Sequence, residues 1–374
     1  MRALSAFLGA LTLALFAAFP RHLAAQIDLT VDHKGIAIGD VPRVTGLRLN
    51  YRDRHLERVD GINATIWSPY QNGSKGLVRG LALGLPVTGA DRIDGVGVGI
   101  LGVGAEERFR GIGVGAAGIG SGGNLEGIMV GGLGVGSGRD VVGIGVGGLG
   151  VGSGGSLRGG FVGGLGAGSG GDINGVVIGG LGAGASGNVQ GIAVGGLGVG
   201  ASGDITGILV GGLGAGSGGS ARGILVGGLG VGAAKDLRGI AIGGIGVGAG
   251  KTLTGLAIGG VGVGAGELLR GVGIAAIGVG APEVRGLAIG GFGAGARNAR
   301  GALVSAGWTR LEHGTLRGLA VGSFNQLKGT QRGLAIGIVN YAEELHGVQV
   351  GLINIARNNS RGTRVLPIVN VHGD

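Results

Sequence analysis

The stretch LRGIAIGGIGVG at residues 237–248 contains the pattern that decides the fold. Counted from Gly239 as position 0, bulky apolar residues stand at −2, +1, +3, +6 and +8. The pairs +1/+3 and +6/+8 each have a spacing of two residues, which is the period of a β-strand. Gly243-Gly244 separates the pairs, and two glycines suit a tight bend. A helix is excluded, because each of so many glycines would cost about 1 kcal/mol there. The stretch therefore predicts two short strands joined by a bend.

The same stretch recurs every 16 residues along the chain. The glycine at position 0 is found at Gly111, Gly127, Gly143, Gly159, Gly175, Gly191, Gly207, Gly223, Gly239, Gly255 and Gly271. Identical steps mean that each unit packs on its neighbour in the same way, as in stacked repeat proteins. We therefore expect an all-β fold. It is a parallel β-solenoid of ~16-residue glycine-rich coils, with two short strands per coil and atypical terminal coils.

The apolar files lead to an expectation about which side chains form the interior. The file at +3 is β-branched in coil after coil, for example Val194, Val210 and Val226, and such residues suit stacked strands. We predict that +1 and +3 point inward, so that +2 points outward. Polar residues gather at −5 to −1, where we expect a turn.

Weaker copies of the repeat extend in both directions, and they set the expected domain boundaries. Residues 26–79 form divergent N-terminal repeats, residues 80–300 the regular solenoid, and residues 301–374 divergent C-terminal repeats. Larger, more polar terminal coils would close an open apolar core. Residues 1–25 contain Arg2, a long apolar stretch and a small-residue end, which predicts a secretory signal peptide. An uncleaved membrane anchor is the alternative.

The chain has no cysteine, so neither disulfides nor a lipidated cysteine is available to it. Arg2 and Arg21 account for two of the nine net positive charges. Arginine recurs at position −1 in the later coils, and stacking would align these side chains into a stripe. We regard it as a candidate anion-binding stripe for envelope polysaccharide or lipopolysaccharide, or else as a solvated turn edge. Nucleic acid is not expected, since aromatic residues do not interleave the stripe. The candidate residues are Arg238, Arg270, Arg285, Arg300, Arg317 and Arg332.

A second candidate surface follows from the expected outward direction of +2. This file is small or apolar, and glycines at +4, +5 and +7 extend it. Such a face would form an apolar contact ribbon for self-association or for an outer-membrane component, unless small residues there only relieve crowding. Its largest members are Phe161, Leu209 and Leu225.

The sequence contains no pattern typical of catalysis. Its six histidines are scattered and form no metal-ligand pair, and the GxGxxG-like strings arise from low complexity. Aspartate recurs in the turn file only in alternate coils, which is too sparse for a calcium β-roll. We therefore expect no enzyme, no cofactor and no metal.

In the last coils asparagine appears at +7, as Asn325, Asn340 and Asn354. Glycine and asparagine both tolerate a positive φ, so we expect a left-handed position there, with amide ladders between coils. The segments GLAIGIVN (333–340) and GVQVGLIN (347–354) follow the pattern G-[LV]-x-[IV]-G-[LI]-[IV]-N. Over about residues 318–370 the chain resembles a family of uncharacterised bacterial exported proteins, the surface repeat-containing proteins. The resemblance implies an exported protein and supplies no activity and no site residues.

Taken together, these features predict a non-enzymatic exported repeat protein with a structural or adhesive role at the cell envelope or surface. Its location would be the periplasm, the outer-membrane surface or the extracellular space. An outer-membrane β-barrel, including a pore, is the main alternative, because 16 residues can also form one strand and one turn. An ice- or polysaccharide-binding solenoid is a further alternative.

Overall fold

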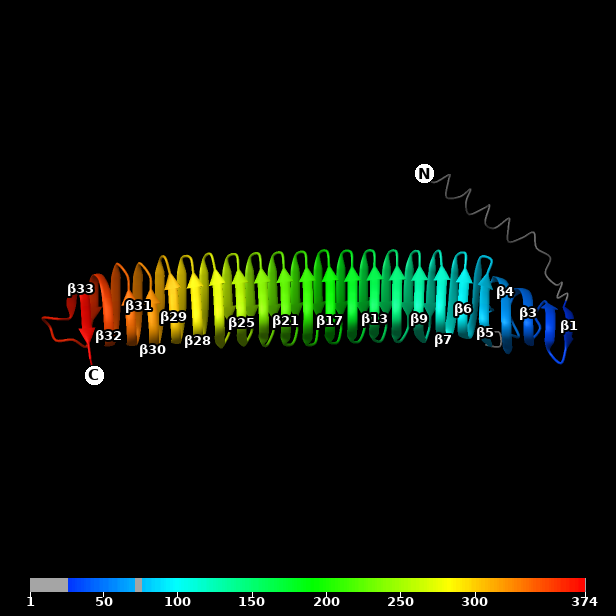
Figure 1. Cartoon of the computed structure of the whole chain (residues 1–374), viewed down its shortest axis with the longest axis horizontal. Coiled ribbons are helices and arrows are strands. Elements are labelled where there is room, and N and C mark those ends of the chain that lie inside the picture. Colours follow the sequence, from blue (N-terminus) through cyan, green and yellow to red (C-terminus); the bar gives the residue numbers. More distant parts are fainter. Residues whose placement is uncertain (1–25, 71–75, 374) are drawn as a thin grey trace, which may run out of the picture. The chain divides into compact units, whose positions relative to one another are not determined.

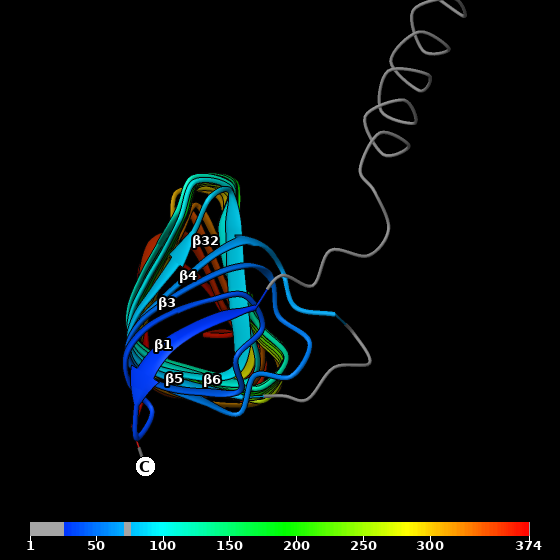
Figure 2. The ribbon, with the colours of Figure 1, turned by 90° about the vertical axis from the view of Figure 1, so that its right-hand side faces the viewer.

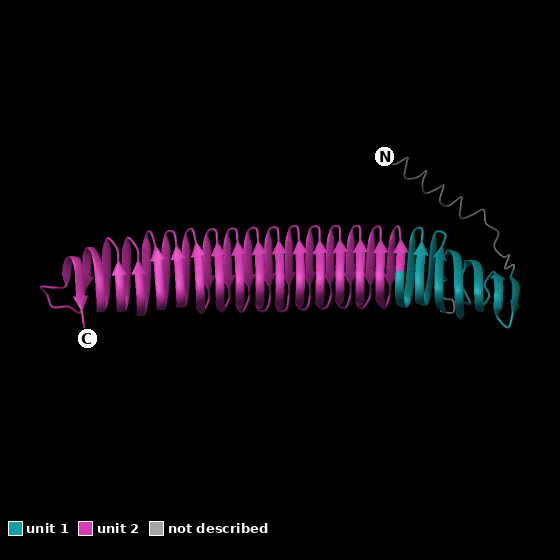
Figure 3. Cartoon of the chain, viewed as in Figure 1, with its two compact units in different colours: residues 1–112 teal, residues 113–374 magenta. Residues whose placement is uncertain are grey.

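The computed structural model describes residues 26–70 and 76–373, and it divides the chain into two compact units, residues 1–112 and 113–374 (Figure 3). Every regular element in the described residues is a β-strand. The expected signal peptide at residues 1–25 lies outside the described residues.

Unit 1 contains longer strands, which pair mostly in parallel. They are β1 (Ile27–Val31), β2 (Lys34–Ile38), β3 (Arg43–Arg52), β4 (Arg58–Trp67), β5 (Leu77–Gly84), β6 (Val87–Gly99) and most of β7 (Gly102–Gly115). From β2 to β6 each strand runs parallel to the next, with Gly35, Gly46, Gly61, Gly80 and Gly95 in register. β1 and β2 form an antiparallel hairpin that ends this series.

Unit 2 alternates short and longer strands. The four-residue strands are β8 (Gly118–Ser121), β10 (Gly134–Ser137), β12 (Gly150–Ser153), β14 (Gly166–Ser169), β16 (Gly182–Ala185), β18 (Gly198–Ala201), β20 (Gly214–Ser217), β22 (Gly230–Ala233), β24 (Gly246–Ala249) and β26 (Gly262–Ala265). The longer strands are β9 (Asn124–Gly131), β11 (Val141–Gly147), β13 (Leu157–Gly163), β15 (Ile173–Gly179), β17 (Val189–Gly195), β19 (Ile205–Gly211), β21 (Ala221–Gly227), β23 (Leu237–Gly243), β25 (Thr252–Gly259) and β27 (Leu268–Ala275). Then follow β28 (Gly278–Gly290), β29 (Gly293–Ser305), β30 (Trp308–Val321), β31 (Phe324–Ile336), β32 (Val339–Ala356) and β33 (Val365–His372).

Each strand of the regular region pairs in parallel with its copy one coil away. Val194 lies beside Val210, and Val210 beside Val226, in a register that repeats every 16 residues. Successive coils of unit 2 lie side by side in chain order (Figure 1), and in the end-on view the coils of this unit enclose an interior (Figure 2). The prediction of a parallel β-solenoid with two short strands per coil is confirmed.

The prediction about which side chains form the interior is wrong by one residue. Val210 at +3 is 37% exposed and Ile208 at +1 is 38% exposed, whereas Leu209 between them is fully buried. The same alternation holds in the neighbouring strands, so the interior consists of positions −2, +2, +8 and +10.

The interior file at +2 varies in size, and the variation is offset either inside the same coil or in the next one. In several coils a large residue at +2 is paired with alanine at +8, as in Phe161/Ala167, Val177/Ala183 and Leu209/Ala215. Leu225 and Met129 are instead paired with valine at +8, and each lies beside a small +2 residue of the next coil, Ala241 or Gly145. Alanine at +2 is paired with valine at +8, as in Ala193/Val199, Ala241/Val247 and Ala257/Val263. Close packing requires this balance, since interiors tolerate neither voids nor excess volume. The uniform β-branched file at +3 faces outward, where no such adjustment is needed.

Some neighbouring coils share the adjustment, as the coils of Gly145 and Phe161 illustrate. Gly145 occupies +2 in its coil, and a Cβ added there would lie 2.9 Å from the ring of Phe161, its partner in the next coil. The phenyl ring therefore fills the space that the glycine leaves.

The repeated glycine at position 0 is required by the backbone. In unit 2 its φ lies between +118° and +139° from Gly127 to Gly271, a region that side chains rarely adopt. A Cβ on Gly239 would overlap the carbonyl oxygen of Gly223 in the coil before it. The bend at Gly243-Gly244 is equally tight, since added Cβ atoms would overlap carbonyl oxygens there as well. The glycines at position 0 and in the bend are thus the places where the backbones of successive coils come too close for a side chain.

The polar turn forms a hydrogen-bonded ladder between coils. The carboxylate of Asp140 accepts a hydrogen bond from the Ser156 backbone N–H at 2.8 Å, and Asp204 accepts one from Ser220 at 2.7 Å. Asn188 accepts one from Asp204 in the same way, at 2.8 Å. These aspartate and asparagine side chains therefore tie one coil to the next.

The asparagine ladder is confirmed, but its position is not the expected one. Asn325 donates to Asn340, and Asn340 donates to Asn354, each through a 2.7 Å amide hydrogen bond in the interior. The strand register places Val279, Ala294, Thr309, Asn325 and Asn340 in one file. The asparagines thus continue the interior +8 file. Asn325 is counted at +7 only because the bend before it has one residue fewer than the bend of the preceding coil. None of the three has a positive φ.

Polar interiors occur near both termini of the described chain. In unit 1, Arg48 is fully buried at the +2 position, where it contacts Asp53 and donates 3.0 Å hydrogen bonds to Asn63 and Asp40. In unit 2, Gln349 donates to Gln331 at 3.1 Å, and β33 pairs antiparallel with β32. These groups replace the apolar ladders where stacking ends, so the expectation of atypical terminal coils is confirmed.

The buried cluster of unit 1 predicts acid sensitivity. Burial raises the pKa of Asp40, but hydrogen bonds from the Arg54 and His55 backbones and the His55 ring, together with the charge of Arg48, outweigh it and hold the pKa below its usual range. A lowered pKa stabilises the folded state above the unfolded value, and this contribution is lost as the pH falls through the folded value. We expect the melting temperature to decline below about pH 4. Thermal melts followed by circular dichroism test this. An equally steep decline in Asp40→Asn would contradict the assignment.

Candidate functional site

The arginines of the candidate anion-binding stripe, here called the arginine ladder, form an unbroken file in unit 2 from Arg270 to Arg332. The strand register places Arg270 beside Arg285, Arg285 beside Arg300, Arg300 beside Arg317, and Arg317 beside Arg332. Adjacent strands are about 4.8 Å apart, so the cations are stacked at that backbone spacing. Arg238 lies in the same file two coils earlier, and Thr254 separates it from Arg270.

The ladder is accessible to solvent and only partly neutralised. The side chains of Arg238 and Arg285 are 51% and 40% exposed and contact Asp236 and Glu283 at 3.5 and 2.7 Å. The hydrogen bond from Arg285 lowers the pKa of Glu283 in spite of slight desolvation, and the charges of Arg300 and Arg270 act in the same direction. Within the described residues, Arg270, Arg300, Arg317 and Arg332 have no acidic partner. Closely spaced like charges of this kind favour an anionic ligand.

The expected apolar contact ribbon does not exist as a surface. Phe161 is 1% exposed, and Leu209 and Leu225 are fully buried. They belong to the interior file, because the side chains at +2, and not those at +1 and +3, point into the solenoid. The glycines at +4 are buried as well, whereas those at +5 face outward.

The apolar residues that do reach the surface are the ones expected inside. We define the outer apolar face of unit 2 as the files at +1, +3 and +6. Members at +1 and +3 are near 40% exposed, as in Ile178, Ile224 and Ile242. The file at +6, here called the corner row, is more exposed, at 45–66%. The corner row comprises Leu133, Leu149, Leu165, Leu181, Leu197, Leu213, Leu229, Ile245, Val261, Ile277 and Phe292.

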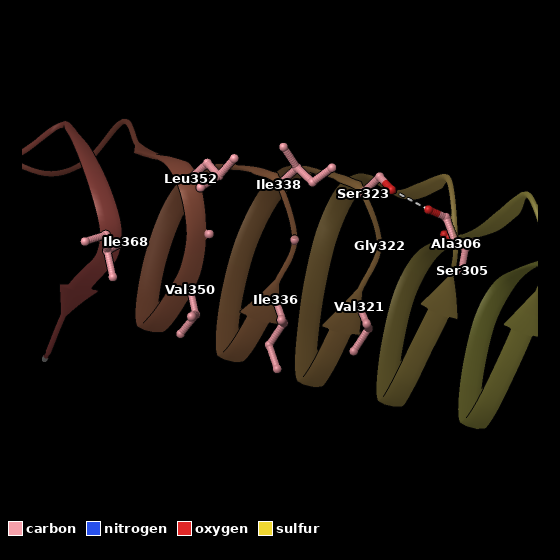
Figure 4. A pocket seen from close by; sticks show the side chains of 12 residues that line it. Ser305, Ala306, Val321, Gly322, Ser323, Ile336, Ile338, Val350, Leu352 and Ile368 are labelled. Atoms are coloured by element: carbon pink, nitrogen blue, oxygen red, sulfur yellow. Dashed lines mark hydrogen bonds between the residues drawn. The ribbon is translucent and has the colours of Figure 1, made fainter.

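The face is hollowed into a groove of about 590 Å³ over the last coils (Figure 4). One rim is formed by Val321, Ile336 and Val350, and the opposite rim by Ser323, Ile338 and Leu352. Glycines form the floor between the rims, at Gly322, Gly337 and Gly351, and Ile368 of β33 lies at one end. Added Cβ atoms on Gly337 and Gly351 would crowd the asparagine ladder, so the bare floor follows from the packing beneath it.

Sequence reasoning found the arginine ladder but missed the outer apolar face. The missed signal was the coupling of +2 with +8, since residues that balance each other in volume must share an interior. Arg48 and Asn63 at +2 in unit 1 favour an outward +2 by residue type, because such side chains are mostly exposed, whereas in the structure they form a buried polar cluster.

Among the described residues, no group of three or more histidine, aspartate or glutamate side chains is placed to hold a metal ion. Nor does that part of the chain contain a helix long and apolar enough to cross a membrane. Comparisons with protein-family models, with curated proteins and with solved structures return no match.

Proposed function

We propose that this chain is a non-enzymatic, exported repeat protein with a structural or adhesive role at the cell envelope. In this proposal the arginine ladder binds an anionic polymer, such as envelope polysaccharide or lipopolysaccharide. The observation that carries the proposal is the in-register stacking of five arginines, Arg270, Arg285, Arg300, Arg317 and Arg332, in consecutive coils. The apolar N-terminal stretch and the resemblance of the last coils to exported repeat proteins support the expected location.

A file of cations suits a polymer better than a small anion. Each coil contributes one guanidinium, and the spacing of about 4.8 Å repeats along the file. A polyanion can engage several guanidinium groups at once, and arginine binds phosphate, sulfate-like and carboxylate groups through two parallel hydrogen bonds. Multiple weak contacts along one chain then add to a strong attachment.

The test is to replace four ladder residues, Arg270, Arg300, Arg317 and Arg332, by glutamine and to measure retention on heparin. Binding through exposed charges is weakened by salt, as the screening length falls from about 10 Å at 0.1 M to about 3 Å at 1 M. We expect the wild-type protein to elute at high salt and the variant to elute near 0.1 M. Circular dichroism should be unchanged, since these side chains lie outside the interior files.

The matched control removes the same number of charges elsewhere in unit 2. Arg139, Lys235, Lys251 and Arg297 lie outside the ladder, and their replacement by glutamine should lower the elution salt only slightly. Equal loss in both variants would mean that net charge, and not the ladder, is responsible.

A further inference from the structure

The outer apolar face of unit 2 requires a cover. Isolated apolar side chains on a surface are ordinary, but contiguous apolar patches beyond several hundred Å² mark contact sites. Here the corner row alone continues from Leu133 to Phe292 with every member about half exposed, and the files at +1 and +3 run beside it. No polar side chain interrupts these files from Val176 to Ile245.

The flank of this face is cationic in its later coils, where position −1 is Arg222, Arg238, Arg270 and Arg285. In the coils between Gly175 and Gly207 the same position is uncharged, as Asn174, Gln190 and Thr206. Position −1 lies two residues before +1 on the outward side of the same strand, so that Arg238, Ile240 and Ile242 all point outward. The aspartates at −3 occur in the polar turn, where Asp140 and Asp204 accept backbone hydrogen bonds from the next coil. A second copy of the chain would therefore bring no free acidic file to meet the arginine ladder.

We propose that the outer apolar face lies on a lipid layer whose headgroups carry phosphate. The aliphatic side chains enter the acyl region and the arginine ladder contacts the phosphates. The layer of outward side chains on a sheet is about 5 Å deep, half the ~10 Å spacing of packed sheets, and surface-bound apolar faces penetrate about 5–10 Å. Basic residues near an anionic leaflet add to the attraction. The inference takes only the envelope location from the proposed function.

The groove is the part of this face that would hold a single acyl chain. Its rims are aliphatic apart from serine side chains, and its floor is bare backbone at Gly322, Gly337 and Gly351. A flexible methylene chain fits such a channel because it requires no directed hydrogen bond.

Vesicle flotation of the purified protein tests the proposal. We expect it to float with vesicles of phosphatidylcholine and phosphatidylglycerol, and more weakly with phosphatidylcholine alone. Replacing Leu181, Leu197 and Leu213 by glutamine should reduce the vesicle-bound fraction at least tenfold. These corner-row residues are 49–50% exposed, so the variant should fold, as circular dichroism would verify. The control replaces the exposed turn residues Ser186, Ser202 and Ala234 by glutamine and should float as the wild type does.

Heparin retention separates this proposal from the proposed function. The corner-row variant should lose vesicles and keep heparin, whereas the arginine variant should lose heparin and the preference for anionic vesicles. Equal flotation of the corner-row variant and the wild type would overturn the proposal. It would also be overturned if the wild type ignored vesicles and instead formed a dimer that the corner-row variant dissociates, because a second copy would then cover the face.

Discussion

Replacing Leu209 by aspartate is expected to destabilise unit 2 severely, by about 4 kcal/mol or more. Leu209 is fully buried in the interior file, and its neighbours there, Ala193 and Leu225, offer no hydrogen bond to a carboxylate. The variant must either bury an unpaired charge or protonate it, and it also loses the aliphatic contacts of leucine. Denaturant unfolding followed by far-ultraviolet circular dichroism measures the loss.

Val210→Asp is the matched control, one residue along the same strand. Val210 is 37% exposed, so its carboxylate would remain in water. We expect a loss of about 1 kcal/mol or less, from the weaker strand preference of aspartate. If Val210→Asp were the more damaging substitution, +1 and +3 would form the interior, and the burial of Leu209 at +2 would be contradicted.

Gly239→Ala is expected to cost about 3 kcal/mol or more, although it adds a single methyl group. Its φ is +122°, and the new Cβ would overlap the carbonyl oxygen of Gly223. Both atoms belong to backbone that parallel pairing holds on each side, so neither can move away without breaking the ladder. Thermal or denaturant unfolding would report the change.

Gly248→Ala provides the comparison within the same coil. An added Cβ there would have no atom within 4 Å, and its φ is not positive. We expect unchanged stability or a gain of up to about 1 kcal/mol, because alanine restricts the unfolded chain. Similar losses in both variants would show that glycine content, and not the stacking contact at position 0, determines stability.

The period of the sequence was sufficient to predict the solenoid, its register and therefore the arginine ladder. Register follows directly from a 16-residue step, since each residue must lie beside its copy. The period does not show which of the alternating side chains point inward. A strand places alternate residues on opposite sides, and either side can be the interior. A file of β-branched residues at +3 predicts an interior, yet Val210 and Ile242 of that file lie on the open surface of the sheet.

The asparagine file illustrates a second limit. Counting from Gly318 places Asn325 at +7, where the earlier coils have glycine. The register instead aligns it with Thr309 in the interior, since the bend before it lacks one residue. A deletion inside a bend leaves the glycine spacing nearly regular, so sequence counting could predict the amide ladder but not its place in the coil.

For the two candidate surfaces as well, the sequence could predict which residues align but not which of them are exposed. Arg285 and Arg300 could be aligned from the sequence because alignment follows from the period alone, and arginine is rarely buried without a partner. Phe161, Leu209 and Leu225 could not be assigned correctly, because their exposure depends entirely on which side of the strand points inward.

The balance of volumes inside each coil has a consequence for how such a chain can change length. A coil in which +2 and +8 already compensate each other, such as the one with Ala241 and Val247, brings its complete interior with it. Duplication or loss of that segment as a unit would leave its neighbours with the same contacts, so the array can be lengthened or shortened in whole coils. The coils of Gly145 and Phe161 differ, because the ring of one occupies the space of the other, and separating them would leave either a void or a clash.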